Sequence, residues 1–172
     1  MIIVSDTNIL SSLTAGESLT AFMRLYQRDK LIIPPSVQQE LQAGFERGKT
    51  YLQQVLQAIQ TRQIEALPLS AEEELMTYKY PGGLNEGERE AIALAQRRKA
   101  TLLSNDMEAQ RYCAQRDIRV LTLADVLRAL WIEQILSPDE VRNAMSRMEQ
   151  VETHSFTANQ LTGIFAPFET ET

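Results

Sequence analysis

The sequence predicts an α/β fold in which parallel strands are joined by helices. Short apolar runs alternate with amphipathic segments along most of its 172 residues, and this alternation is typical of strand–helix–strand units. Helix-capping pairs mark the start of several of the amphipathic segments. The length and the composition, 44% apolar and 23% charged, fit a globular domain with a sizeable core.

The apolar runs predict five strands. They cover about 2–5, 30–33, 63–67, 101–104 and 118–122. Parallel strands need crossover connections of a dozen or more residues, usually a helix. The segments between the runs are long enough for such crossovers.

Eight helices are expected, near 8–28, 36–47, 49–61, 71–79, 86–99, 107–115, 123–135 and 138–150. Five of them open on a residue that can cap a helix, followed three positions later by a side chain that can cap in return. These pairs are Ser36 with Gln39, Ser70 with Glu73, Asn85 with Glu88, Thr122 with Asp125, and Ser137 with Glu140. We therefore place a single domain at 1–150 and a C-terminal tail at 151–172.

Composition excludes several classes of protein. No run of 18 apolar residues exists and the N-terminus lacks the basic segment of a signal peptide, so no membrane association is expected. The single cysteine, Cys113, cannot form an internal disulfide, which fits a reducing, cytoplasmic setting. A formal charge of −6 argues against a nonspecific grip on nucleic-acid phosphates, although the clustered arginines and lysines could form a local basic rim.

Two aspartates follow apolar runs directly. Asp6 ends the run Met1–Val4, and Asp106 closes the segment Leu103-Ser104-Asn105-Asp106. Both therefore lie at the carboxyl end of an expected strand, the edge where open α/β sheets bind ligands. Alone, Asp6 could be a turn former and Asp106 a helix cap.

Two glutamates complete an acidic set. At about 100° per residue, Glu88 falls within the apolar stripe of the helix at 86–99 and should face inward, whereas Glu86 and Glu90 fall on the opposite, solvated side. Glu40 lies at the flank of an apolar stripe one turn into its helix. Taken alone, Glu88 could be only a capping partner and Glu40 a surface residue favoured by the helix dipole.

A shared site explains all four acidic residues together. Neighbouring carboxylates would repel by roughly 4 kcal/mol per pair at a separation of about 4 Å and an effective dielectric near 20. A divalent cation relieves this repulsion, and oxygen ligands favour Mg²⁺ or Mn²⁺.

Four segments of the chain resemble the acidic motifs of PIN-domain nucleases. They are Val4–Asn8, Val37–Leu41, Leu84–Ala95 and Leu103–Asp106, in matching order over about residues 1–135. The resemblance implies a three-layer α/β/α fold with a central parallel sheet, and Mg²⁺- or Mn²⁺-dependent cleavage of RNA. The form of the third segment is especially similar to toxins of the VapBC type, which implies an antitoxin partner and a homodimer.

The resemblance assigns roles to individual residues. Asp6, Glu40, Glu88 and Asp106 match the catalytic quartet, with Asp6, Glu88 and Asp106 as metal ligands and Asn8 and Ser104 as polar support. Glu40 would bind metal or hold the water. Where family members often carry a further acidic residue, this chain offers Glu108 and Gln110.

The expected reaction is metal-assisted hydrolysis. A bound ion would lower the pKa of a water and stabilise the leaving oxygen. The one histidine, His154, lies in the tail and is expected to be a surface residue, so no conventional histidine base is available.

Two alternatives remain open. An aspartyl-nucleophile phosphatase also places an aspartate at a strand end, but its pattern requires a second aspartate where this chain has Asn8. A non-catalytic PIN-like module for nucleic-acid or protein binding is the other.

Apolar residues near the C-terminus need a cover. Val126, Leu127, Leu130 and Trp131 form a helical stripe, and the tail adds Phe156, Leu161, Ile164, Phe165 and Phe168. Either the tail folds back on its own domain, or it contributes to a homodimer or an antitoxin-binding surface.

Overall fold

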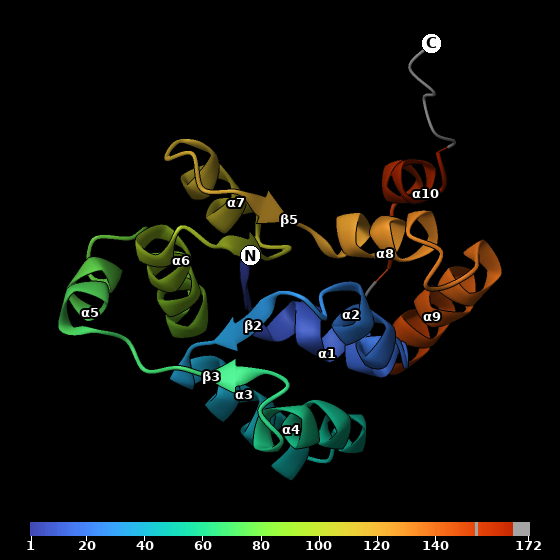
Figure 1. Ribbon diagram of the computed structural model, residues 1–172, viewed down its shortest axis with the longest axis horizontal. Helices are drawn as coiled ribbons and strands as arrows, with labels where there is room; N and C mark the ends of the chain where they lie inside the picture. Colours follow the sequence, from blue (N-terminus) through green and yellow to red (C-terminus); the bar gives the residue numbers. More distant parts are fainter. Residues whose placement is uncertain (154, 167–172) are drawn as a thin grey trace.

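The computed structural model describes residues 1–153 and 155–166 and contains a five-stranded parallel sheet (Figure 1). The strands are β1 (Ile2–Ser5), β2 (Lys30–Ile33), β3 (Glu65–Ala66), β4 (Thr101–Leu103) and β5 (Val120–Leu121). Their order is β3-β2-β1-β4-β5, and each neighbouring pair is parallel. The five predicted strands are all present, and β3 and β5 are shorter than expected.

Helices and one 3₁₀ turn connect the strands. They are α1 (Thr7–Ala15), α2 (Leu19–Leu25), α3 (Pro35–Glu46), the 3₁₀ turn η1 (Thr50–Leu52), α4 (Gln53–Gln60), α5 (Ala71–Thr77), α6 (Glu86–Arg98), α7 (Met107–Ala114), α8 (Leu123–Ile132), α9 (Pro138–Val151) and α10 (Ala158–Phe165). Within the described residues, no helix has the length and apolar character needed to cross a membrane.

The strands bury side chains on both faces, which makes the architecture the predicted three-layer α/β/α fold. Val4, Ile32 and Leu102 pack with α6 and α7 on one face. Ile3, Ile33 and Leu103 pack with helices α1 to α4 and α8 to α9 on the other. This alternation follows from the two-residue repeat of a strand. Figure 1 shows α5 and α6 on one side of the sheet and α1, α8 and α9 on the other.

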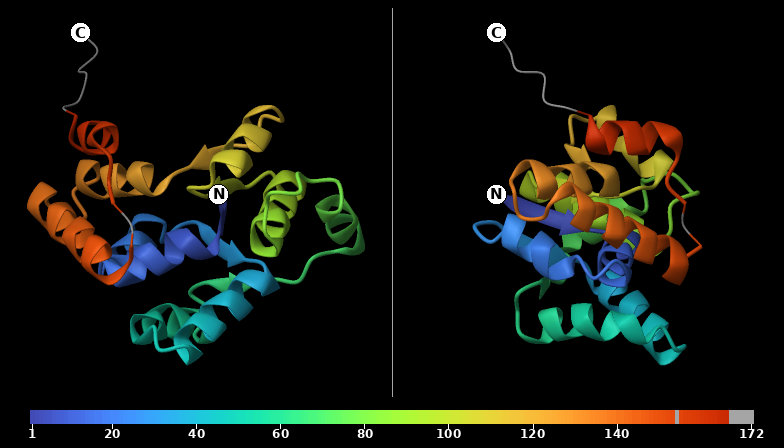
Figure 2. Two further views of the ribbon diagram at one scale, coloured as in Figure 1. Left: turned by 180° about the vertical axis from the view of Figure 1, so that it is seen from behind. Right: turned by 90° about the vertical axis from the view of Figure 1, so that its right-hand side faces the viewer.

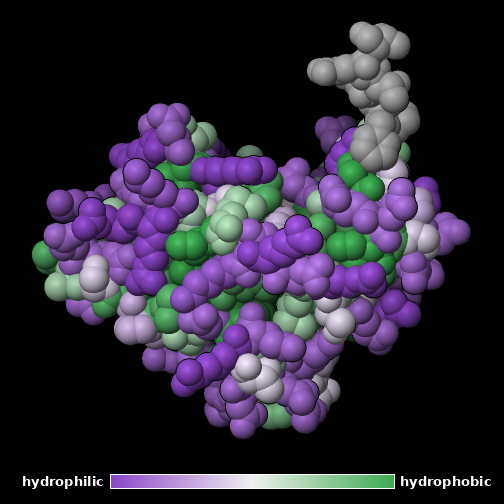
Figure 3. Space-filling view, in the orientation of Figure 1, coloured by the Kyte–Doolittle hydropathy of each residue, from purple (hydrophilic) through white to green (hydrophobic). Residues whose placement is uncertain are grey.

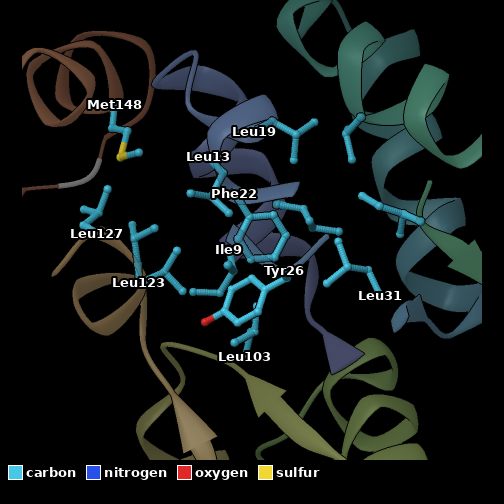
Figure 4. Close-up of a cluster of buried hydrophobic side chains, with 14 of the residues drawn as sticks. Ile9, Leu13, Leu19, Phe22, Tyr26, Leu31, Leu103, Leu123, Leu127 and Met148 are labelled. Carbon is cyan, nitrogen blue, oxygen red and sulfur yellow. The ribbon is translucent and has the colours of Figure 1, made fainter. Parts of the chain in front are cut away.

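The larger of the two cores lies between the sheet and the helices of the second face. Phe22 of α2 and Tyr26, the residue that follows this helix, occupy its centre, with ring centroids 5.2 Å apart in an edge-to-face arrangement. Leu127 of α8 and Met148 of α9 close it on the side away from Leu31 (Figure 4). Hydrophilic residues cover most of the surface in the view of Figure 3.

The predicted single helix at 8–28 is wrong, because the chain breaks it between α1 and α2. A Cβ added at Gly16 would lie 2.5 Å from the Met148 side chain, so the chain here passes directly against α9. The next residue, Glu17, has a φ of 55°, outside the helical region. Close packing by a helix over 120 residues away in the sequence therefore sets the break.

Four of the five predicted capping pairs are confirmed as reciprocal capping boxes. The pair Ser36–Gln39 is wrong, because α3 begins at Pro35 with Pro34 as its N-cap. Proline suits the first position of a helix, where its missing N–H is not needed. Ser36 is therefore inside the first turn of α3.

The described part of the tail folds back on its own domain. Helix α10 lies against α8 in both views of Figure 2, and Ile164 is fully buried. Trp131 Nε1 and Arg128 Nη1 both donate to the Ile164 carbonyl, at 2.7 and 3.3 Å. The apolar stripe of α8 is thus covered from within the chain. His154 and Phe168 lie outside the described residues.

Candidate active site

The parallel strands bring Asp6 and Asp106 to the same edge of the sheet. Asp6 follows β1 and Asp106 follows β4, the two strands between which the strand order reverses. Asp6 N–H donates to the Leu103 carbonyl at 3.1 Å, which ties the ends of the two strands together. Each aspartate is also the N-cap of the following helix. The geometry therefore combines the expected site with the expected capping role.

Asp6 is the most buried acidic residue of this edge, with 2% of its surface exposed. One oxygen, Oδ1, accepts from the Ile9 N–H at 2.9 Å. The other, Oδ2, is buried and has no partner in hydrogen-bonding geometry among the described residues, although the Ser104 hydroxyl lies close enough to lower the pKa of the group. Burial raises the pKa of Asp6 to about 6; the Ile9 N–H and Ser104 oppose this rise, and the charges of Glu88 and Asp106 add to it.

Glu88 faces the same edge from the first turn of α6. Its Oε2 accepts from the Asn85 N–H at 2.9 Å, and the Asn85 side chain accepts from the Glu88 N–H at 2.8 Å. Desolvation raises the pKa of Glu88, and the carboxylates of Asp106, Glu40 and Glu108 raise it further. Glu88 thus serves as a capping partner and lies within an acidic cluster.

Glu40 approaches from α3 and is held by a neighbour of Asp6. The Thr7 hydroxyl donates to Glu40 Oε2. Gly87 makes this approach possible, because a Cβ at that position would lie 3.1 Å from Glu40 Oε1 and 3.3 Å from Val37 Cγ2. Sequence reasoning assigned no role to Thr7 or Gly87, although both stand next to a predicted site residue.

Ser104 and Glu108 surround Asp106. The Ser104 hydroxyl is buried and accepts from the Asp106 N–H at 3.1 Å, while Asp106 Oδ1 accepts from the Ala109 N–H at 2.7 Å. Glu108, which is acidic where Gln110 is not, lies near enough to raise the pKa of Glu88. The side chain of Gln110 donates instead to the Ser104 carbonyl.

A small cavity of about 20 Å³ lies among these residues. Its lining consists of Asp6, Thr7, Asn8, Glu40, Asn85 and Glu88. This volume suffices for about one water molecule or one ion. Three of the four predicted acidic residues therefore meet at one cavity, and Asp106 interacts electrostatically with two of them.

The donor set suits a hard divalent cation in its chemistry. It consists of carboxylate oxygens, and one of these, Asp6 Oδ2, is buried without a described partner. Through the described part of the chain, no three acidic, histidine or cysteine side chains are already arranged to hold a metal ion. Glu40, Glu88 and Asp106 instead point carboxylate oxygens at Thr7, Asn85 and Ala109. Binding a cation would exchange some of these contacts.

The expectation that Glu90 is solvated is wrong. Its Oε2 accepts from both the N–H and the hydroxyl of Ser36 in the first turn of α3, and the side chain is half-buried. The negative charge meets the positive end of the α3 dipole. Glu86, in contrast, is exposed as expected. Glu90 therefore joins α6 to α3, and helical phase alone could not show where α3 would lie.

A second, larger hollow of about 630 Å³ adjoins the acidic edge. Asn8 lines both the small cavity and this hollow, and Asn105 borders it near Asp106. The remaining lining comes from α1, from η1 with the preceding Lys49, and from the end of α9 with the residues that follow it; it includes Tyr51 and Glu152. No local pattern in the sequence indicated these three residues.

Comparisons with known proteins agree with this architecture. A family model described as PIN domain matches residues 2–161. Among solved structures, the fold is similar to a chain in the crystal structure of VapBC2 from Rickettsia felis bound to a DNA fragment from their promoter. The TM-score is 0.56 at 19% sequence identity, and the alignment covers 71% of this chain and 98% of that chain. No curated protein matches the sequence.

Proposed function

Since this chain belongs to the PIN-domain family, we propose that it is a metal-dependent endoribonuclease that hydrolyses RNA phosphodiester bonds. PIN domains are generally nucleases. The observation that carries the proposal is the buried carboxylate of Asp6, which has an unpaired oxygen among the described residues and lies within the field of Glu88 and Asp106. A buried carboxylate without a partner is costly unless a cation or a proton compensates it.

Asp6, Glu88 and Asp106 would hold Mg²⁺ or Mn²⁺. When bound, the ion supplies a water of lowered pKa and neutralises charge on the phosphate. Glu40, held by the Thr7 hydroxyl, lines the same cavity and would orient the attacking water. Ser104 and Asn8 support the arrangement, Ser104 through the Asp106 N–H and Asn8 from the cavity wall.

The partner class follows from the fold relative. The solved structure is of VapBC2 bound to a promoter DNA fragment, and we propose that this chain acts as a toxin that pairs with an antitoxin protein. The proposal includes a homodimer of this chain. A non-catalytic binding module is the second candidate. The observation that favours it is that no three potential ligands in the described residues are already arranged around a metal position.

The decisive experiment is cleavage of a labelled RNA by the purified chain with Mg²⁺, with Mn²⁺ and with EDTA. We expect cleavage only with a metal. Glu88→Gln should lower the rate by about a hundredfold, because it removes a negative charge that would hold the metal ion. Glu86→Gln is the matched control, since Glu86 is exposed on the same helical turn, and should retain the wild-type rate. Equal losses in both variants would refute the site, and no cleavage under any condition would favour the binding module.

A further inference from the structure

The hollow beside the acidic edge has the size of a binding site for a small group. Its volume of about 630 Å³ falls within the range of ligand pockets. It neighbours the candidate active site, because Asn8 lines both cavities. An RNA strand that extends past Asn8 from the small cavity would therefore reach this hollow.

A fixed carboxylate lies in this hollow. Glu152, at the C-terminal end of α9, accepts from the Ser11 hydroxyl at 2.5 Å, the Tyr51 hydroxyl at 3.2 Å and the Ser12 hydroxyl at 2.6 Å. Burial and the charge of Glu152 raise the pKa of Tyr51, so its phenol stays protonated as a donor. Three hydroxyls from two other elements thus hold one carboxylate in one orientation.

The hydrogen bonds leave one acceptor position of this carboxylate without a described partner. Oε1 accepts two of the described hydrogen bonds and Oε2 accepts one, whereas a carboxylate has about four acceptor positions. The open position suits a neutral donor such as an amino group. A phosphate would be repelled there, because both groups are negative.

The rim of the hollow supplies complementary groups. Lys49 is an exposed cation, suited to a phosphate, and the half-buried Tyr51 offers an aromatic ring beside Glu152. Asn105 is oriented by the Leu123 N–H, which donates to its Oδ1 at 2.9 Å. Charge at the rim, an acceptor inside and an aromatic ring match a nucleotide whose base points inward.

Resting on the proposed ribonuclease function, we propose that this hollow is a specificity subsite for one unpaired nucleotide of the RNA next to the cleaved bond. Glu152 accepts a hydrogen bond from the exocyclic amino group of the base. Cytosine presents such an amino group, whereas uracil presents a carbonyl oxygen at the same position. Uracil would place that oxygen against the carboxylate, so the subsite discriminates against it.

The test measures binding of short RNAs by fluorescence anisotropy, with the full-length chain in EDTA so that no metal-dependent cleavage occurs. Pentacytidylate should bind about tenfold more tightly than pentauridylate. Glu152→Gln should bring this ratio close to one, because the amide no longer offers a charged acceptor. Asp139→Asn removes an exposed charge at the other end of α9 and should leave the ratio unchanged. Lys49→Ala should weaken both oligonucleotides equally.

A melting curve shows whether Glu152→Gln is folded. If Glu152→Gln is unstable, the binding of both oligonucleotides to Lys49→Ala still tests whether RNA occupies the hollow. Equal binding of both oligonucleotides to the wild type would overturn the subsite, as would a preference that survives Glu152→Gln. Binding of neither oligonucleotide would also overturn it.

A cleavage assay with Mn²⁺ separates this inference from the proposed function. If the wild type and Glu152→Gln cleave RNA with the same base preference, the subsite is refuted and the proposed nuclease function stands. A cytosine preference lost in Glu152→Gln, without cleavage at any metal concentration, supports the subsite and refutes the nuclease.

Discussion

Two buried carboxylates of this chain have opposite surroundings. Glu73 is 3% exposed, and Asp6 is 2% exposed. Glu73 Oε1 accepts from Arg98 Nε at 2.9 Å, and its Oε2 accepts from Arg98 Nη2 at 3.0 Å and from the Ser70 N–H at 2.8 Å. In Asp6, only Oδ1 has a described hydrogen-bond partner. A similarly low solvent exposure therefore accompanies a fully hydrogen-bonded carboxylate at Glu73 and an incompletely hydrogen-bonded one at Asp6.

The ionisation of the two groups follows from this difference. Hydrogen bonds from Arg98 lower the pKa of Glu73, whereas desolvation raises that of Asp6 to about 6. Glu73 joins α5 to α6 through Arg98, and both of its carboxylate oxygens accept hydrogen bonds within the protein. Asp6 lies beside other carboxylates and lacks a counter-charge, which is the condition of a group awaiting a ligand. The contrast teaches that burial alone does not identify a functional carboxylate, but the state of its partners does.

The largest expected effect is the loss of RNA cleavage in Asp6→Asn. The rate should fall at least a hundredfold, equivalent to about 3 kcal/mol of transition-state stabilisation, because the variant removes a charge that would hold the metal. Asparagine also caps helices well, so α1 should remain intact. Single-turnover rates with saturating Mn²⁺ measure the effect, and circular dichroism checks the fold. A fully active Asp6→Asn protein would remove Asp6 from the site.

The second prediction concerns the destabilisation expected in Glu73→Gln. The free energy of unfolding should fall by about 3 kcal/mol, because the variant leaves the Arg98 guanidinium partly buried without its counter-charge. The rate of cleavage at 25 °C should stay near that of the wild type, since Glu73 has no contact with the acidic edge. Urea denaturation and a cleavage assay on the same preparation test both parts. A specific loss of rate without a loss of stability would reverse the roles assigned to the two carboxylates.

The sequence identifies both aspartates of the edge because their signals are local. Asp6 and Asp106 each end an apolar run, and the parallel arrangement of strands then brings them together. The capping box of Asn85 and Glu88 also lies within four consecutive residues. Patterns of this length are set by backbone geometry, so they are readable before the fold is known.

Other features depend on how distant elements pack, and the sequence does not indicate them. Thr7 meets Glu40 because α1 packs against α3, and Ser36 meets Glu90 because α6 packs against α3. Ser12 and Glu152 are 140 residues apart and have no local pattern in common. The break after α1 likewise reflects the packing of α9. The roles of the site residues and the boundary at residue 150 remain predictions.

A third prediction tests whether the deficit at Asp6 is filled by metal. At a concentration of Mn²⁺ 100 times its dissociation constant, the free energy of unfolding of the wild type should rise by about 2.7 kcal/mol. Asp6→Asn should lose most of this gain, and Glu73→Gln should keep it in full. Melting curves with and without Mn²⁺ give the comparison. An equal response in Asp6→Asn would show that the metal binds elsewhere.

The smallest expected effect is a pH-dependent gain in stability for Asp6→Asn without metal. The folded pKa of Asp6, about 6, exceeds its ordinary value of 3.8, so the folded state binds the proton more tightly. The stabilisation of the folded wild type by the protonated Asp6 carboxyl group is therefore fully present below about pH 4, and it is lost as the pH rises through about 6.

Because asparagine carries no charge, the free energy of unfolding of Asp6→Asn does not fall in this way as the pH rises. In EDTA at pH 7.5 it should be more stable than the wild type by on the order of 2 kcal/mol, and the difference should shrink toward zero near pH 4. Urea denaturation across this pH range measures the difference. Glu73→Gln should show the opposite sign at neutral pH, since the pKa of Glu73 is lowered in the fold. A wild type as stable as Asp6→Asn at every pH would mean that the Asp6 carboxylate is compensated within the protein, and the distinction between the two buried carboxylates would fail.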